Sequence, residues 1–187
     1  MVESTGRILL VYATREGQTA KIAERLAELL RAKNREVDVI DAANSEQIAG
    51  VRLGDYGLLV FGASMHAGGL EREIVSLINQ HKESLRGRPR SLFLVLLSAA
   101  TQDPQLRAKW LADARQKMTA QLKVEFPDSE MLAGALRYSQ YPLPQKWMMR
   151  RIARQAGVET DISQDYEYTN WEQVAGYAER LTRLSQS

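Results

Sequence analysis

Six consecutive residues near the amino terminus have the types and spacing to bind a phosphate group. They are Thr14, Arg15, Glu16, Gly17, Gln18 and Thr19, between an apolar run at 8–12 and a segment with helical spacing. The first amides of a helix have no intrahelical acceptor, and the helix dipole adds about half a positive charge at that end. The two threonines would add hydroxyl donors, and Gly17 would let the backbone curve closely around an anion. The pattern therefore predicts a phosphate site at the start of a helix.

The loop lacks two common nucleotide-binding patterns. No lysine follows its glycine as in G-x-x-x-x-G-K-[ST], so a nucleoside triphosphate with magnesium is not expected. The G-x-G-x-x-G pattern of dinucleotide-binding proteins is also missing. A mononucleotide fits better, with flavin mononucleotide (FMN) as the leading candidate. The alternative is an ordinary turn in which Thr19 caps the following helix.

Five short apolar runs predict the strands that position this loop. They cover residues 7–12, 36–40, 57–62, 91–99 and 130–136. Runs that are apolar almost throughout are typical of parallel strands covered on both faces. Because they alternate with segments of helical spacing, we expect the 187 residues to form one α/β domain. Its sheet would be doubly wound and parallel, with the strand order 2-1-3-4-5.

Four apolar stripes predict helices between and after these strands. The first has Ile22, Leu26 and Leu29, the second Leu70, Ile74, Leu77 and Ile78, the third Leu106, Trp110, Ala114 and Met118, and the fourth Trp171, Val174, Ala178 and Leu181. Thr169 and Glu172 have the spacing of a capping box before the last stripe. The segment between the second and third strands is too short and polar for a long helix.

Two more loops are expected beside the phosphate loop, because ligands of doubly wound sheets lie beyond the carboxyl ends of the strands. Glycines and small residues at 63–69 would let the backbone approach a flat ring, with Met65 and His66 flanking it. Residues 98–103 offer hydroxyls and amides but no aromatic side chain. Either loop could be a plain turn, the second capped by Thr101 or Asp103. The predicted cofactor contacts here are Ser64, Met65, His66, Ala67, Gly68, Ser98, Ala99, Ala100, Thr101 and Gln102.

A long basic connection at 137–168 precedes the last helix, and such length often accompanies function. Between 137 and 158 its charged residues are Arg137, Lys146, Arg150, Arg151 and Arg154, with no acidic residue. The whole chain has a net charge of +2, so the remainder sums to about −3. The positive charge is therefore concentrated in this segment.

On a helix, residues 146–156 divide into a basic arc that contains Trp147 and an apolar arc. The apolar arc holds Met148, Met149, Ile152, Ala153 and Ala156. Such a helix can lie on an anionic membrane, bind an acidic substrate or partner, or pack on its own sheet. Tyrosines among the charges would permit nucleic-acid stacking, but a nearly neutral chain with one basic patch does not favour it. We predict substrate or membrane contacts from Arg137, Tyr138, Lys146, Trp147, Arg150, Arg151 and Arg154.

The composition excludes several classes of site. Without cysteine there is no disulfide, thiolate metal site or cysteine nucleophile. His66 and His81 are too few and too far apart for a metal cluster, and we expect His66 to be an exposed loop residue rather than a catalytic base. No catalytic acid or base is assigned. Residues 1–6 lack signal-peptide features, and the apolar runs are shorter than the roughly 20 residues that span a bilayer. We expect a cytoplasmic protein.

Several segments resemble the menaquinone-dependent protoporphyrinogen dehydrogenases of bacteria, a flavodoxin-like family with a long insert before the last helix. The loop at 14–19 resembles the flavodoxin phosphate loop. The more specific segments are Phe61-Gly62-Ala63-Ser64, 133–138, 159–161 and 168–174. The resemblance covers nearly the whole chain. The loop at 65–69 and the segment 143–145 depart from the family pattern.

The resemblance implies an FMN enzyme of haem biosynthesis that oxidises protoporphyrinogen IX and reduces menaquinone or ubiquinone. It also implies peripheral attachment to the inner face of the cytoplasmic membrane, and it places the FMN phosphate at residues 14–19. The basic insert would then pair with the substrate propionates, the membrane or both. The alternatives are a flavodoxin-type electron carrier, a flavin-dependent quinone reductase and a flavin-free membrane-binding module. The oligomeric state is left open, with a homo-oligomer among the options.

Overall fold

A parallel sheet forms the centre of the protein. The computed structural model describes residues 6–66 and 69–186. The main strands are β1 (Ile8–Ala13), β2 (Val37–Asp41), β3 (Leu58–His66), β5 (Arg90–Leu96) and β6 (Asp128–Ala133), in the order β2-β1-β3-β5-β6. The short β4 (Gly69–Leu70) pairs antiparallel with the end of β3. The predicted order of five parallel strands is confirmed, with β4 as an addition.

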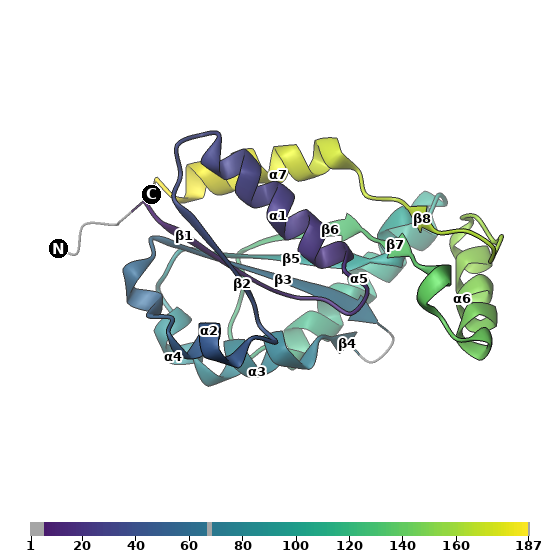
Figure 1. The fold of residues 1–187 in the computed structure, drawn as a ribbon, viewed down its shortest axis with the longest axis horizontal. Coiled ribbons are helices and arrows are strands. Elements are labelled where there is room, and N and C mark those ends of the chain that lie inside the picture. Colours follow the sequence, from purple (N-terminus) through teal and green to yellow (C-terminus); the bar gives the residue numbers. More distant parts are fainter. Residues whose placement is uncertain (1–5, 67–68, 187) are drawn as a thin grey trace.

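Helices cover both faces of this sheet (Figure 1). On one face lie α1 (Gln18–Arg31) and α7 (Trp171–Leu184), and on the other α2 (Ser45–Ala49), α3 (Arg72–Gln80), α4 (Lys82–Leu85) and α5 (Pro104–Gln121). Alternate residues of β1 enter different apolar clusters. Ile8 and Leu10 pack with α1 and α7, whereas Leu9 and Val11 pack with α3 and α5. Burial on both faces explains why the strands are apolar almost throughout.

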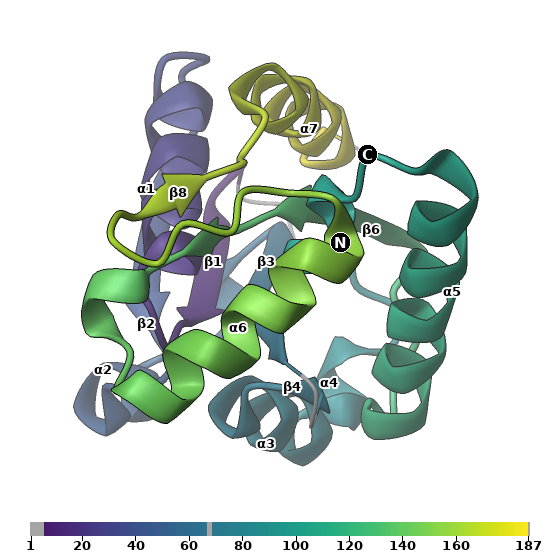
Figure 2. The same cartoon turned by 90° about the vertical axis from the view of Figure 1, so that its right-hand side faces the viewer.

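The insert before α7 has a small core of its own. It contains β7 (Ala135–Leu136), the 3₁₀ turn η3 (Tyr138–Gln140), α6 (Leu143–Ala156) and β8 (Tyr166–Glu167), and β7 pairs with β8. Its buried apolar cluster consists of Leu136, Tyr138, Tyr141, Ala153, Ala156 and Val158. Seen toward the carboxyl ends of the strands, α6 crosses in front of the sheet (Figure 2). The predicted helix in the basic insert is present and begins at Leu143.

Two predicted strands end earlier than expected. Residues 97–100, predicted to continue the fourth strand, form the 3₁₀ turn η2 (Leu97–Ala100) instead. The fifth strand stops at Ala133, and residues 135–136 leave the main sheet to pair with β8. A Cβ on Gly134 would lie 3.0 Å from Val95 Cγ1, so the chain passes close to β5 where it turns away. Apolar character alone did not distinguish a strand from the buried turn after it.

Two predictions at helix starts were also wrong. Leu70 lies in β4, and α3 begins at Arg72. The cap of α7 is Asn170, whose Oδ1 accepts hydrogen bonds from the amides of Glu172 and Gln173. Thr169 instead donates its hydroxyl hydrogen to the carbonyl of Ala133 at 2.8 Å. The capping box failed because Thr169 connects the insert to the sheet.

Candidate flavin site

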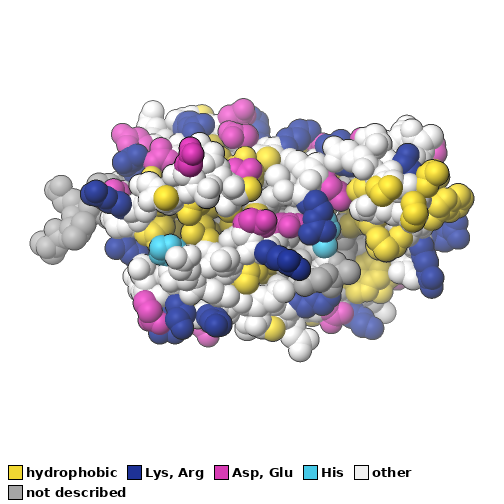
Figure 3. Space-filling view, turned by 60° about the horizontal axis from the view of Figure 1, so that its bottom comes forward, with side chains coloured by type: hydrophobic (Ala, Val, Ile, Leu, Met, Phe, Trp, Pro, Cys, Tyr) yellow, Lys and Arg dark blue, Asp and Glu magenta, His cyan; other side chains and the backbone are white. Residues whose placement is uncertain are grey.

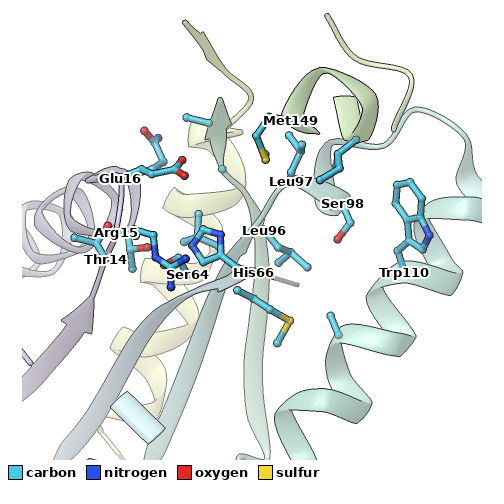
Figure 4. A pocket seen from close by; sticks show the side chains of 18 of the residues that line it. Thr14, Arg15, Glu16, Ser64, His66, Leu96, Leu97, Ser98, Trp110 and Met149 are labelled. Carbon is cyan, nitrogen blue, oxygen red and sulfur yellow. The ribbon is translucent and has the colours of Figure 1, made fainter. Parts of the chain in front are cut away.

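A cavity of about 600 Å³ lies beyond the carboxyl ends of β1, β3 and β5. In Figure 4, Thr14, Arg15 and Glu16 lie on one side and Trp110 on the other, with Ser64 and His66 between them and Met149 above. The lining residues are Thr14, Arg15, Glu16, Gln18, Thr19, Ser64, Met65, His66, Val95, Leu96, Leu97, Ser98, Trp110, Asp113, Ala114, Lys117, Gly134, Ala135, Gln145, Met148, Met149 and Ile152. The structure thus brings the three predicted loops to one site.

The phosphate loop has a geometry suited to an anion. Gly17 adopts φ = 85° as the residue before α1, a conformation that residues with a Cβ rarely adopt. Its amide donates to Thr14 Oγ1 at 3.0 Å, which closes the turn. The helix begins at Gln18, so Thr19 is not its cap and the alternative of a turn capped by Thr19 is wrong.

The hydroxyl of Thr19 lacks a hydrogen-bond partner that a bound ligand could provide. Thr19 is 1% exposed, lines the cavity, and its Oγ1 has no hydrogen-bond partner within the protein. A buried polar group without a partner costs about 1–3 kcal/mol. A phosphate oxygen at the start of α1 would satisfy this hydroxyl together with the first amides of the helix. The residues present therefore fit the phosphate of FMN.

A cluster of polar side chains surrounds the carboxylate of Glu71 at the second loop. Ser64 Oγ donates to Glu71 Oε1 at 2.9 Å, Arg15 Nη2 donates to Oε2 at 3.3 Å, and His66 Nε2 lies 3.2 Å from Oε1. Burial and the nearby Arg15 lower the pKa of His66, against the opposite effects of Glu71 and Glu16. His66 is therefore a partly buried histidine beside the Glu71 carboxylate and not the exposed loop residue that we expected. Ala67 and Gly68 lie outside the described residues.

Only the first part of the third loop lines the cavity. Leu96, Leu97 and Ser98 reach it, whereas the predicted contacts Ala99, Ala100, Thr101 and Gln102 are not among the lining residues. After the turn η2, Ala100 packs on the apolar cluster of the insert and the Gln102 amide donates to the Ala156 carbonyl at 3.4 Å, whereas Ala99 packs on the core beside α3 and α5. As predicted, Asp103 caps the following helix, α5, through the amides of Gln105 and Leu106.

The insert is fastened to the phosphate loop. Tyr141 donates its hydroxyl to Glu16 Oε2 at 2.7 Å, and burial together with this carboxylate raises the pKa of Tyr141. Arg137 Nη2 donates to Gln18 Oε1 at 3.0 Å and lies 3.6 Å from Glu167 Oε2. The structure thus gives Arg137 partners within the protein. Tyr138 is fully buried in the cluster of the insert.

The two arcs of α6 have different surroundings. Its apolar residues Met148, Met149 and Ile152 line the cavity, together with Gln145. The predicted contacts Lys146, Trp147, Arg150, Arg151 and Arg154 do not line it. Arg150 stacks over the Trp147 ring, with 5.3 Å between Cζ and the ring centroid. The apolar arc of α6 therefore covers the cavity, and its basic arc lies outside the cavity lining.

Two parts of the site were not predicted. Trp110, Asp113 and Lys117 line the cavity from one side of α5, at the helical spacing i, i+3 and i+7. That spacing was visible in the sequence, but we used Trp110 only as part of the apolar stripe that predicts the helix. Glu71 had no signal, because only the fold brings it to Arg15 and Ser64. The described residues contain no group of three or more side chains suited to a metal ion.

Comparisons with known proteins agree with this architecture. A model of the flavodoxin domain family matches residues 9–163. The protoporphyrinogen IX dehydrogenase [quinone] of Escherichia coli K12 is 30% identical over 179 residues, which cover 96% of each chain. Its counterpart from Leishmania major is 25% identical over 98% of this chain and 78% of its own.

Solved structures show the same fold. A short-chain flavodoxin associated with a bacterial microcompartment aligns with a TM-score of 0.53 at 14% identity, covering 96% of this chain and 98% of its own. A rubredoxin oxygen:oxidoreductase from Desulfovibrio gigas aligns with a TM-score of 0.56 at 15% identity, covering 98% of this chain and 37% of its own.

Proposed function

Because this chain belongs to the flavodoxin family, and within it to the protoporphyrinogen IX dehydrogenases, we propose that it oxidises protoporphyrinogen IX to protoporphyrin IX in haem biosynthesis, with a respiratory quinone as electron acceptor. The protein is an oxidoreductase, and FMN is its cofactor. FMN supplies a ring that takes up two electrons from a reduced substrate and returns them to an acceptor. The residues of the chain bind and orient the reactants.

The phosphate loop would hold the FMN phosphate through the start of α1 and the hydroxyls of Thr14 and Thr19. Ser64, Met65 and His66 then lie on one side of the ring position, and Leu97 and Ser98 on another. Ala67, Gly68, Ala99, Ala100, Thr101 and Gln102 stay predictions for which the structure adds no contact.

The observation that carries the substrate assignment is the roof that α6 forms over the flavin cavity. Met148, Met149 and Ile152 line the cavity from above, so a large apolar ring system beside the flavin would contact them. Trp110 offers an aromatic wall on the opposite side from the phosphate loop (Figure 4). We expect the tetrapyrrole to lie between the flavin and α6.

Purified protein tests this proposal directly. It should contain FMN or take it up, visible from the flavin absorbance, and with an added quinone it should convert protoporphyrinogen IX anaerobically into fluorescent porphyrin. Flavin uptake without porphyrin formation would contradict the substrate assignment. Oxidation of NADH or NADPH with quinone, or reduction by a flavodoxin reductase without turnover of a small substrate, would indicate a quinone reductase or a carrier instead.

The exposed surface of α6, which includes one residue of the cavity lining, has the character of a membrane-binding surface. Leu143, Trp147 and Met148 are the large apolar side chains exposed among the described residues, with 69%, 57% and 55% of their surface accessible. Yellow side chains gather with dark blue ones at this end of the molecule (Figure 3). Among the described residues, 6–66 and 69–186, no helix is long and apolar enough to cross a bilayer. We propose that α6 lies on the anionic inner face of the cytoplasmic membrane, with its basic arc and Trp147 toward the lipid.

Vesicle binding tests this orientation. Sedimentation with anionic vesicles should fall with salt and in Arg151→Glu/Arg154→Glu, since both arginines are exposed on α6. The matched control is Arg107→Glu/Arg115→Glu, which makes the same charge change at exposed positions of α5. Equal loss in both double variants would indicate a general charge effect and contradict a specific role of α6.

A further inference from the structure

The carboxylate of Glu71 joins three side chains from two of the site loops. Ser64 and His66 come from the end of β3, and Arg15 from the phosphate loop. The Glu71 side chain is 10% exposed, so these contacts are largely shielded from water. A buried carboxylate with several donors holds them in fixed positions. The hydrogen bonds from Ser64 and Arg15 therefore hold the Glu71 carboxylate in place beside the His66 ring, whose Nε2 itself makes no hydrogen bond.

The arrangement determines which nitrogen of His66 is basic. Nε2 is buried and lies 3.2 Å from Glu71 Oε1, without the orientation of a hydrogen bond. The negative charge of this carboxylate still favours the tautomer with its proton on Nε2. Nδ1 then carries the free lone pair, on a ring that lines the cavity. A carboxylate behind an imidazole also stabilises the imidazolium that forms when the ring takes up a proton.

Burial, more than the charges around it, favours the neutral form of the His66 ring. Arg15 and Glu16 come from the phosphate loop, Glu71 stands before α3, and Asp113 and Lys117 line the same cavity from α5. Burial is the largest influence and, with Arg15, lowers the pKa of His66 below its usual value of 6.5, while Glu71 and Glu16 oppose the shift. The neutral imidazole is the form that can accept a proton.

We propose that His66 is the catalytic base of the dehydrogenation and that Glu71 is its positioning residue. This inference rests on the proposed function. The complete oxidation removes six electrons in three two-electron steps. In each step a meso carbon would lose a hydride, which the bound flavin would accept, and His66 Nδ1 would take up a proton. Over the three steps these protons would come from two pyrrole N–H groups and from the fourth meso carbon, so that four meso hydrogens and two N–H hydrogens leave in total. When the electrons pass to the quinone, its reduction consumes two protons, and His66 returns to the neutral form by releasing its own.

The two histidines of the chain provide a matched pair of variants. His66→Gln should lower kcat for porphyrinogen oxidation about 100-fold, as loss of a general base typically does, and FMN affinity should change little. His81→Gln, at the end of α3 and outside the cavity lining, should leave kcat unchanged. Imidazole in the buffer should partly restore the turnover of His66→Ala.

The pH dependence separates a base from a structural residue. Activity of the wild type should fall on the acid side as His66 becomes protonated, below pH 6.5. Since Glu71 raises the pKa of His66, Glu71→Gln should move this acid limb to lower pH. In the flavin-free protein, NMR titration of the imidazole resonances should show the same shift, with His81→Gln assigning the two signals.

Two results overturn the inference, and they are distinguishable. A His66→Gln variant that binds FMN and keeps the kcat of the wild type at every pH contradicts the role of His66 and leaves the proposed function standing. A wild-type protein that binds FMN but forms no porphyrin contradicts the proposed function, and the inference with it.

Discussion

The phosphate loop and the insert helix α6 lie at the same cavity but are built in different ways. The loop depends on local geometry, with a left-handed Gly17, a short turn closed by Thr14 and the start of α1. The position of α6 depends on contacts between distant parts of the chain, such as those of Tyr141 with Glu16 and of Arg137 with Gln18. We infer that the loop determines which cofactor binds and that α6 determines which substrate reaches it. Variants should therefore separate the two properties.

The largest effect on FMN is expected from Thr19→Val, which keeps the shape of the side chain but removes its hydroxyl. Loss of a hydrogen bond to a charged phosphate costs about 1.5–3 kcal/mol, so the Kd of FMN should rise about 10- to 100-fold. The flavin-free protein should not lose stability, because this hydroxyl has no partner in the protein. Fluorescence titration with FMN and thermal unfolding measure both.

Thr119→Val is the control for this substitution, since Thr119 is an exposed α5 residue whose hydroxyl bonds its own helix. It should leave the Kd of FMN unchanged. An unaltered Kd of FMN in Thr19→Val would mean that the phosphate does not bind at this loop. The loop would then not be the part of the site that determines the cofactor.

Gly17→Ala should weaken FMN binding about tenfold, because a left-handed conformation costs a residue with a Cβ about 1–2 kcal/mol. Gly87→Ala is a matched control, since Gly87 has φ = 75° against 85° for Gly17 and neither Cβ would meet another atom within 4 Å. The strain weakens FMN binding only as far as the flavin-free loop relaxes out of the left-handed conformation, so in the absence of FMN Gly17→Ala should lose less stability than Gly87→Ala. Equal FMN affinities in the two would show that the shape of the loop does not matter.

Tyr141→Phe tests the connection between the regions. Removing the hydrogen bond to the Glu16 carboxylate should destabilise the flavin-free protein by about 1–2 kcal/mol, with an effect on the Kd of FMN below about threefold. Urea unfolding and FMN titration provide the two numbers. A loss of FMN affinity as large as that of Thr19→Val would mean that loop and insert act as one unit.

The same variant should show a small effect at alkaline pH. Because the pKa of Tyr141 is raised in the folded protein, the hydroxyl of Tyr141 loses its proton at lower pH in the unfolded chain than in the folded one. The stabilising contribution of this hydroxyl is therefore fully present below pH 10 and is lost as the pH rises above that value. Between pH 9 and about 11 the wild type should therefore lose more stability than Tyr141→Phe. Parallel stability curves of the two proteins would contradict a contribution from this hydrogen bond.

The sequence was informative wherever a local rule decides the structure. Apolar runs predicted the strands and their order, and the phosphate loop could be located from its residue types alone. Glu71 could not be predicted, because its contacts with Arg15, Ser64 and His66 arise from three segments that meet only in the fold. The same holds for Ala100 and Gln102, which contact the insert after a 3₁₀ turn. The amphipathic pattern of α6 was correct, but it could not show that the apolar arc roofs a cavity.

The inference that α6 determines the substrate and the phosphate loop the cofactor is tested most directly by kcat/KM for protoporphyrinogen IX in Met149→Asp, measured with saturating FMN. Gln155→Asp, at an exposed position of α6, is the control. A charge in the apolar side of α6 should lower kcat/KM at least about tenfold, because binding of the tetrapyrrole would bury this charge without a partner, while the Kd of FMN stays within about threefold. The control should match the wild type. If Met149→Asp retains full kcat/KM, or if it loses FMN affinity in proportion to its activity, α6 does not form the substrate side of the site.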